Sequence, residues 1–147
     1  MNRIFGINLM ALFFSALLAA SPVYATQPTL VAETGIRVTR VELTPQIDGN
    51  LLAVVDTRTF GEFDTIHLVV STFAPVQGSG AVLRADWRYG KGNQVQPVHS
   101  EAKSMFMSGP GVIVFQVSKP DGWPPGHYYV EVSLDGVPIR GIPYEVR

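Results

Sequence analysis

The chain has 147 residues, of which 46% are hydrophobic and 16% are charged, and its formal net charge is −1. This composition excludes a disordered chain, and the near-neutral charge lacks the excess of basic residues that is typical of nucleic-acid binding. The sequence contains no cysteine, which removes disulfides, thiol nucleophiles and cysteine-ligated metals. The length allows one domain of ordinary size.

The first 25 residues have the order of a secretory signal peptide. Arg3 gives a short positive start, residues 9–20 are almost wholly apolar, and Val23-Tyr24-Ala25 fits a cleavage site. The apolar stretch is short for a membrane span and no stop-transfer pattern follows, which favours cleavage over retention as an anchor. We expect residues 26–147 to form one exported domain without an integral membrane segment. The lack of cysteine in an exported chain favours a bacterial protein, periplasmic or secreted.

The mature chain reads as short strands separated by turns. Most of the segments alternate apolar and polar residues, and none outside the first 25 residues shows a helical period. Gly78-Ser79-Gly80 and residues 108–111 are read as breaks between strands. Asp135-Gly136 is a strong hairpin signal, and Gly90-Lys91-Gly92-Asn93 indicates a second hairpin. In chain order the expected strands are 36–43, 51–57, 65–73, 81–89, 94–98, 112–118, 127–134 and 137–146. Seven or eight such strands predict an all-β, antiparallel sandwich or barrel.

Two aromatic residues favour an immunoglobulin-like sandwich over a closed barrel. Trp87 lies mid-strand, where the third strand of such a fold places its buried tryptophan. Tyr128 opens the penultimate strand behind a glycine, as in a tyrosine corner, whose hydroxyl bonds upstream backbone. The stretch Lys119–Val137 resembles the closing strands of small exported bacterial immunoglobulin-like domains, and the resemblance covers about the last 30 residues. It implies a fold and no particular activity.

A metal site is considered at two methionines and one histidine. Met105 and Met107 share one face of an expected strand, and His99 lies six residues upstream. Thioether and imidazole groups suit copper, so a copper carrier is one interpretation, and packing of the methionines in the core is the other. His67 and His127 are expected to face outward from their strands, without a metal-binding spacing.

Three aromatic residues are candidates for contact with a partner protein. Phe73 and Tyr129 fall on the outward parity of their strands, and Trp123 lies in a loop. The alternative for Trp123 is that it closes over the end of the core, next to Tyr128. Pro138 and Pro143 predict that the last strand is a sheet edge that resists pairing.

The sequence shows no catalytic set. No serine lies in a G-x-S-x-G setting, no phosphate-binding glycine motif occurs, and Asp56, Glu62 and Asp64 fit a solvated loop. We therefore expect a non-enzymatic periplasmic immunoglobulin-like module that binds or scaffolds another envelope protein, with no cofactor. The alternative is a carrier of a small ligand or of copper, and the oligomeric state stays open.

Overall fold

The computed structural model describes residues 35–147, so the predicted signal peptide and residues 26–34 lie outside the described part. This part contains strands and no α-helix, and it offers no helix that is long and apolar enough to cross a membrane. The strands are β1 (Arg37–Thr44), β2 (Thr59–Phe60), β3 (Ile66–Tyr89), β4 (Gln96–Val117), β5 (Gly126–Leu134) and β6 (Val137–Val146). They form one six-stranded sheet in the order β1-β3-β5-β6-β2, and β4, which lies outside this order, also pairs with β3.

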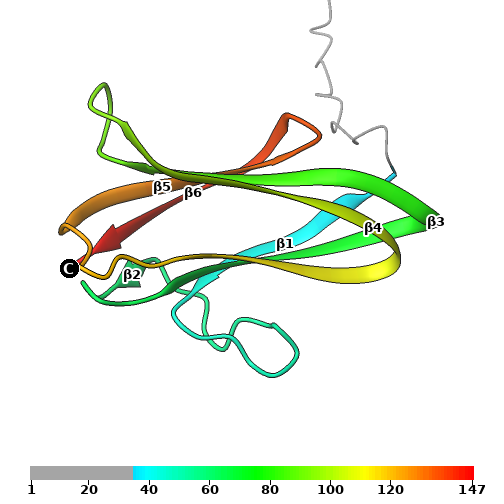
Figure 1. Ribbon diagram of the computed structural model, residues 1–147, viewed down its shortest axis with the longest axis horizontal. Coiled ribbons are helices and arrows are strands. Elements are labelled where there is room, and N and C mark those ends of the chain that lie inside the picture. Colours follow the sequence, from blue (N-terminus) through cyan, green and yellow to red (C-terminus); the bar gives the residue numbers. More distant parts are fainter. Residues whose placement is uncertain (1–34) are drawn as a thin grey trace, which may run out of the picture.

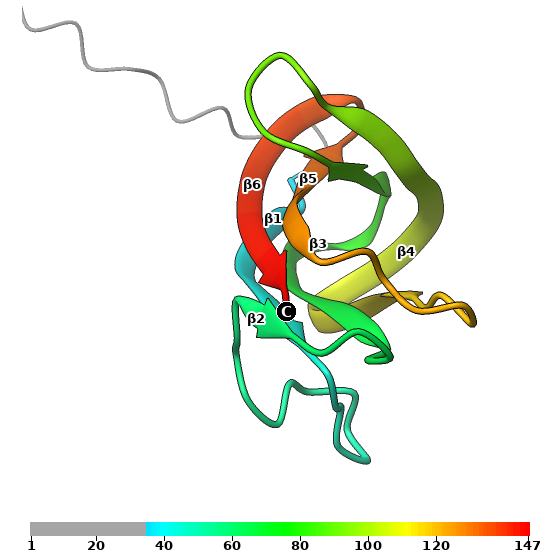
Figure 2. The same ribbon diagram turned by 90° about the vertical axis from the view of Figure 1, so that its left-hand side faces the viewer.

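The sheet curls back on itself because β3 and β4 are long and bend in the middle. The first half of β3 pairs with β1 and with the second half of β4. The second half of β3 pairs with the first half of β4 and with β5. Figure 1 shows the resulting two layers, and Figure 2 shows how the sheet encloses the space between them. The pairing is antiparallel except for the short contact between β2 and β6.

The prediction of an all-β fold is confirmed, but the predicted count of seven or eight strands is wrong. The expected breaks at residues 78–80 and 108–111 are bends inside β3 and β4. Gly78 (φ +74°) and Gly109 (φ +73°) adopt left-handed backbone at these bends, which glycine accepts without steric cost. The expected strand 51–57 is a loop with only an isolated bridge between Ile47 and Ala53.

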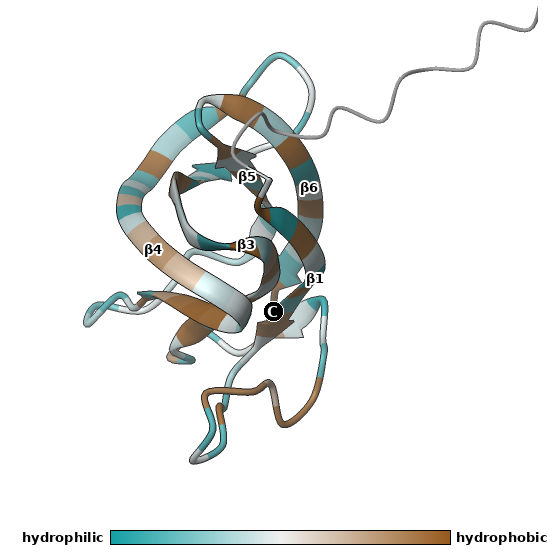
Figure 3. Ribbon diagram, turned by 90° about the vertical axis from the view of Figure 1, so that its right-hand side faces the viewer, coloured by the Kyte–Doolittle hydropathy of each residue, from teal (hydrophilic) through white to brown (hydrophobic). Residues whose placement is uncertain are grey.

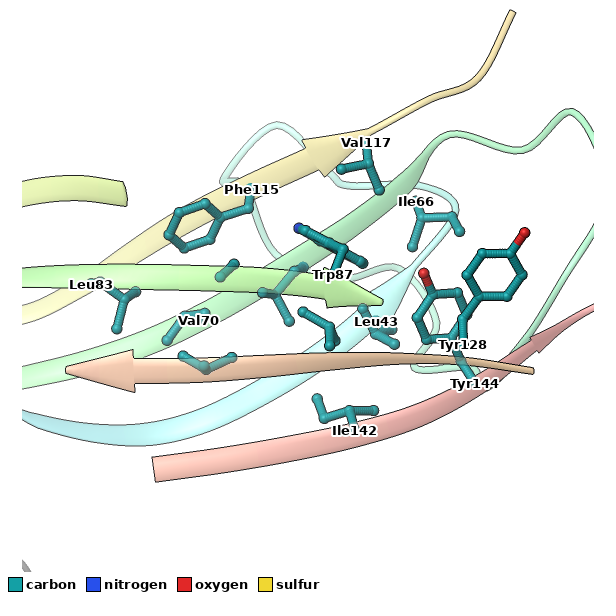
Figure 4. Close-up of a cluster of buried hydrophobic side chains, with 14 of the residues drawn as sticks. Leu43, Ile66, Val70, Leu83, Trp87, Phe115, Val117, Tyr128, Ile142 and Tyr144 are labelled. Carbon is teal, nitrogen blue, oxygen red and sulfur yellow. The ribbon is translucent and has the colours of Figure 1, made fainter. Parts of the chain in front are cut away.

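The core lies between the two layers and is rich in aromatic side chains (Figure 4). Trp87 is 1% exposed and contacts the ring of Tyr144 edge-on, with 6.1 Å between centroids. Tyr128 stacks on Tyr144 at 5.2 Å, and its hydroxyl donates a 2.8 Å hydrogen bond to the Pro124 carbonyl. The buried position of Trp87 and the upstream backbone bond of Tyr128 are both as predicted.

The hairpin signals are also confirmed. Asp135 (φ +49°) and Gly136 (φ +81°) alone connect β5 to β6, and positive φ at both positions is the type I′ arrangement. Residues 90–95 connect β3 to β4. β6 pairs with β2 only at its last two residues, so the rest of its outer edge is unpaired and carries the exposed Pro138 and Pro143.

Candidate functional site

The loop between β1 and β2 exposes a run of apolar side chains. We call residues 47–56 the apolar loop. It protrudes from the body in Figures 1 and 2, and Figure 3 shows hydrophobic residues along it. Four large apolar side chains in it are exposed by 43–56%: Leu51, Leu52, Val54 and Val55. Consecutive apolar residues in a protruding loop cannot all turn toward a core, so the loop presents them to its surroundings.

Hydrogen bonds fix the backbone of the apolar loop. The Asp48 carboxylate accepts bonds from the backbone N–H groups of Asn50 and Leu52, both at 2.8 Å. The Asp48 N–H donates to the Leu52 carbonyl at 2.9 Å, which closes the turn. Leu51 is held at φ +64°, a left-handed conformation that is unfavourable for a leucine. The exposed side chains therefore sit on an ordered backbone that carries local strain.

The base of the apolar loop is tied to β1. The Asp56 carboxylate accepts a 3.1 Å bond from the Leu43 N–H and forms an ion pair with Arg58. The Thr57 N–H donates to the Leu43 carbonyl at 2.8 Å. Both backbone groups of Leu43 that face away from β3 are thus satisfied by this segment. The apolar loop itself contains two carboxylates, Asp48 and Asp56, and no basic residue.

The two methionines and the histidine considered for copper do not converge. Met105 and Met107 are half-buried and pack against the core, and the Met107 sulfur lies 3.4 Å from the Thr72 hydroxyl. His99 is exposed, six residues away along the same strand β4, which corresponds to about 20 Å at roughly 3.3 Å per residue. One ion cannot be ligated by groups so far apart. Within residues 35–147, no cluster of three histidines and carboxylates could hold a metal either.

The three aromatic candidates for a partner surface are not brought together. Trp123 is only 3% exposed, so its expected availability to a partner is wrong. Its indole N–H donates to the Asp64 carbonyl at 2.9 Å and its ring contacts Tyr128 edge-on, which is the expected alternative of closing the end of the core. Phe73 is half-buried beneath the Arg37 guanidinium, at 5.0 Å. Tyr129 is half-buried, with its hydroxyl over Gly141 on the neighbouring strand β6.

The histidines and the acidic residues lie close to where they were expected. His127 is exposed and His67 is half-buried, both on outward positions of their strands. The Asp64 carboxylate accepts a 2.7 Å bond from the Gly61 N–H and so shapes its own turn. Glu62 is exposed in the same segment between β2 and β3, next to Phe63, which is 73% exposed.

Sequence reasoning missed the apolar loop because it read residues 51–57 as a strand. One signal was present. Residues 51–55 are five apolar residues in a row between Asp48 and Asp56, without the alternation of a half-buried strand.

No protein-family model matches the chain, and no curated protein matches its sequence. Solved structures do resemble it. An alkylpurine DNA glycosylase from Pseudomonas fluorescens matches 77% of this chain at 14% identity, with a TM-score of 0.52. A β-glucosidase from Erythrobacter marinus matches 76% at 9% identity, with a TM-score of 0.53. The matched regions span 30% and 15% of those two chains.

An immunoglobulin-like protein from Pseudomonas aeruginosa matches 80% of this chain and 100% of its own, at 9% identity and a TM-score of 0.49. At identities of 14% and 9%, the likenesses to the glycosylase and the β-glucosidase concern the fold alone.

Proposed function

We propose that this chain is an exported, non-enzymatic, immunoglobulin-like module that binds another protein of the bacterial envelope through the apolar loop. The pattern of the first 25 residues supports export, and cleavage after Ala25 leaves residues 26–147 as the module. The absence of a catalytic motif in the sequence supports a binding role.

The pairing of the strands supports the immunoglobulin-like arrangement. β1, the first half of β3 and the second half of β4 form one layer. The other halves of β3 and β4 form the second layer with β5 and β6. The buried Trp87 and the corner bond from Tyr128 to Pro124 occupy the places that this architecture gives them.

The observation that carries the binding function is the exposure of Leu51, Leu52, Val54 and Val55 on an ordered backbone. Burying a side chain of this kind contributes about 1.5–3 kcal/mol relative to leaving it in water. Contiguous apolar surface on a soluble domain marks interaction sites. Because the backbone of the apolar loop is already fixed, less conformational entropy is lost there when a partner binds.

The charges of the apolar loop indicate the chemistry of the partner. Asp48 and Asp56 flank the four apolar side chains, and Arg58 is already paired with Asp56. An anionic lipid surface is therefore disfavoured. The complementary partner is a protein with an apolar contact surface bordered by lysine or arginine side chains.

Photo-crosslinking tests this function. A benzoylphenylalanine replaces Val54 in the apolar loop or, as the matched control, Val137 at the exposed β5–β6 turn. We expect one envelope protein to be crosslinked from position 54 and not from position 137, and the same purified protein to bind the unmodified chain. Equal crosslinking from both positions, or none from position 54, contradicts the proposal.

A further inference from the structure

We propose a second binding site, independent of the apolar loop: the free edge of β4 near Gln116 accepts an extended polypeptide segment that carries a carboxylate. The segment would add as a strand to the sheet. Its carboxylate would be a glutamate or aspartate side chain or a chain terminus. Three features of the molecule lead to this site: unpaired backbone groups, an open groove and the charge of the groove.

The backbone groups of Gln116 face away from the sheet. Within β3, the Ser71 carbonyl points toward β1, because it accepts a hydrogen bond from the Thr39 hydroxyl. The backbone N–H and C=O groups of residues two apart on a strand face the same way. The backbone groups of Val69 and His67 therefore also point toward β1. Their partners on β4, Val114 and Gln116, then direct their N–H and C=O groups to the outer edge. The Val114 carbonyl confirms this, since it accepts a 2.7 Å bond from the Lys103 ammonium.

Two other long edges of the described sheet, those of β6 and β1, are obstructed. Pro138 and Pro143 interrupt the outer edge of β6. At β1, the outward groups of Leu43 are bound by Asp56 and Thr57. By contrast, residues 111–119 contain no proline. Near Gln116, past the Val114 carbonyl that Lys103 occupies, the second half of β4 is thus an edge that is open to strand addition.

A groove lies beside this edge, where the two halves of β4 separate. The Lys103 side chain crosses between the halves to Val114 and lies 5.1 Å from the centre of the Phe115 ring. Beyond this crossing, His99 from one half and Gln116 from the other line a cavity of about 530 Å³. Val117 and Trp123 also line this cavity, and both side chains are largely buried.

The charge of the groove points to a carboxylate. Its lining includes Lys119 and His99 and contains no acidic side chain. Glu101 is the nearest acidic residue along β4, and its carboxylate is paired with Lys103 at 3.2 Å. A segment that pairs with the backbone of Gln116 would bring a side chain or a terminus close to Lys119, which follows on the same chain.

Peptide titration of the purified, isotope-labelled protein tests the site. The probes are three hexapeptides of alternating threonine and valine: one with a single glutamate and an amidated end, one with glutamine and a free carboxyl terminus, and one with glutamine and an amidated end. We expect the two carboxylate peptides to shift the Ser118 amide and Trp123 indole signals, and the neutral peptide to bind more weakly. The two charged probes separate a side-chain carboxylate from a terminal one.

Two proline variants provide the matched control. Gln116→Pro removes an outward N–H that the sheet does not use, so the fold should persist, and peptide affinity should fall by about tenfold. Ser104→Pro alters an exposed position in the other half of β4 and should leave the affinity unchanged. Lys119→Gln should reduce the preference for glutamate over glutamine.

Three results overturn the proposal: no shift with any probe at millimolar concentration, equal affinity of the two proline variants, or no preference for a carboxylate. None of them bears on crosslinking from the apolar loop, so the two proposals fail separately.

Discussion

The aromatic core contains two buried tyrosines with different hydrogen bonding. The Tyr128 hydroxyl donates to Pro124 at 2.8 Å, whereas the buried Tyr144 hydroxyl has no hydrogen-bond partner among residues 35–147. Tyr128→Phe should therefore lower the free energy of unfolding by about 0.5–1.5 kcal/mol. Tyr144→Phe should leave it unchanged or raise it, because an unsatisfied buried hydroxyl is unfavourable. Urea unfolding of both variants measures the difference, and equal losses would contradict these roles.

The same two hydroxyls predict a loss of stability at alkaline pH. Burial raises the pKa of Tyr128 to about 12, and burial also raises the pKa of Tyr144 above its ordinary value. In the unfolded chain a tyrosine titrates near pH 10. A raised pKa in the folded state stabilises the fold fully below pH 10, and this contribution is lost as the pH rises from 10 through 12.

Thermal unfolding between pH 8 and 12 tests this expectation. The melting temperature should stay level to about pH 10 and then fall. The double variant Tyr128→Phe/Tyr144→Phe should show a weaker decline. A double variant with the same decline as the unmodified protein would assign the pH dependence to other groups.

At the scale of the element, the apolar loop is ordered at the expense of local strain. Leu51 keeps φ at +64° although its side chain is 47% exposed and gains little from packing. Asparagine tolerates this conformation better than leucine. Leu51→Asn should therefore raise the free energy of unfolding by about 0.5–1 kcal/mol. It should also weaken partner binding, since one apolar contact is lost.

Measuring both the stability and the partner binding of Leu51→Asn distinguishes a loop whose strain serves binding from a loop whose strain has no role in binding. Chemical denaturation gives the stability, and crosslinking yield from position 54 gives the binding. Higher stability with lower yield is the expected trade-off. A less stable Leu51→Asn protein would show that the leucine packs in the folded state, contrary to its exposure.

At the scale of the whole molecule, local sequence signals identified most of the fold. Alternating residues indicated the strands, and Asp135-Gly136 indicated the hairpin between β5 and β6. Trp87 and Tyr128 were placed in the core from their parity and their neighbours. These features depend on residues close together in the chain, which is why sequence reasoning found them.

Features that depend on distant pairing were not predicted. Gly78 and Gly109 look like strand ends in the sequence, but pairing along both halves of β3 and β4 makes them bends. The apolar loop was read as a strand, because the sequence does not show that no partner strand is available for residues 51–57. Likewise, the half of β4 that carries His99 also carries Met105, but only the extended strand shows how far apart they are.

The central claim is that the apolar loop binds a protein partner through its exposed side chains. The most direct test is the dissociation constant of the crosslinked partner for Val54→Asp, with Val137→Asp as the matched control. Both positions are exposed, so both variants should melt like the unmodified protein. We predict that Val54→Asp weakens binding by at least about tenfold, since a buried valine contributes about 1.5–3 kcal/mol, and that Val137→Asp does not. Equal dissociation constants for the two variants would contradict the account.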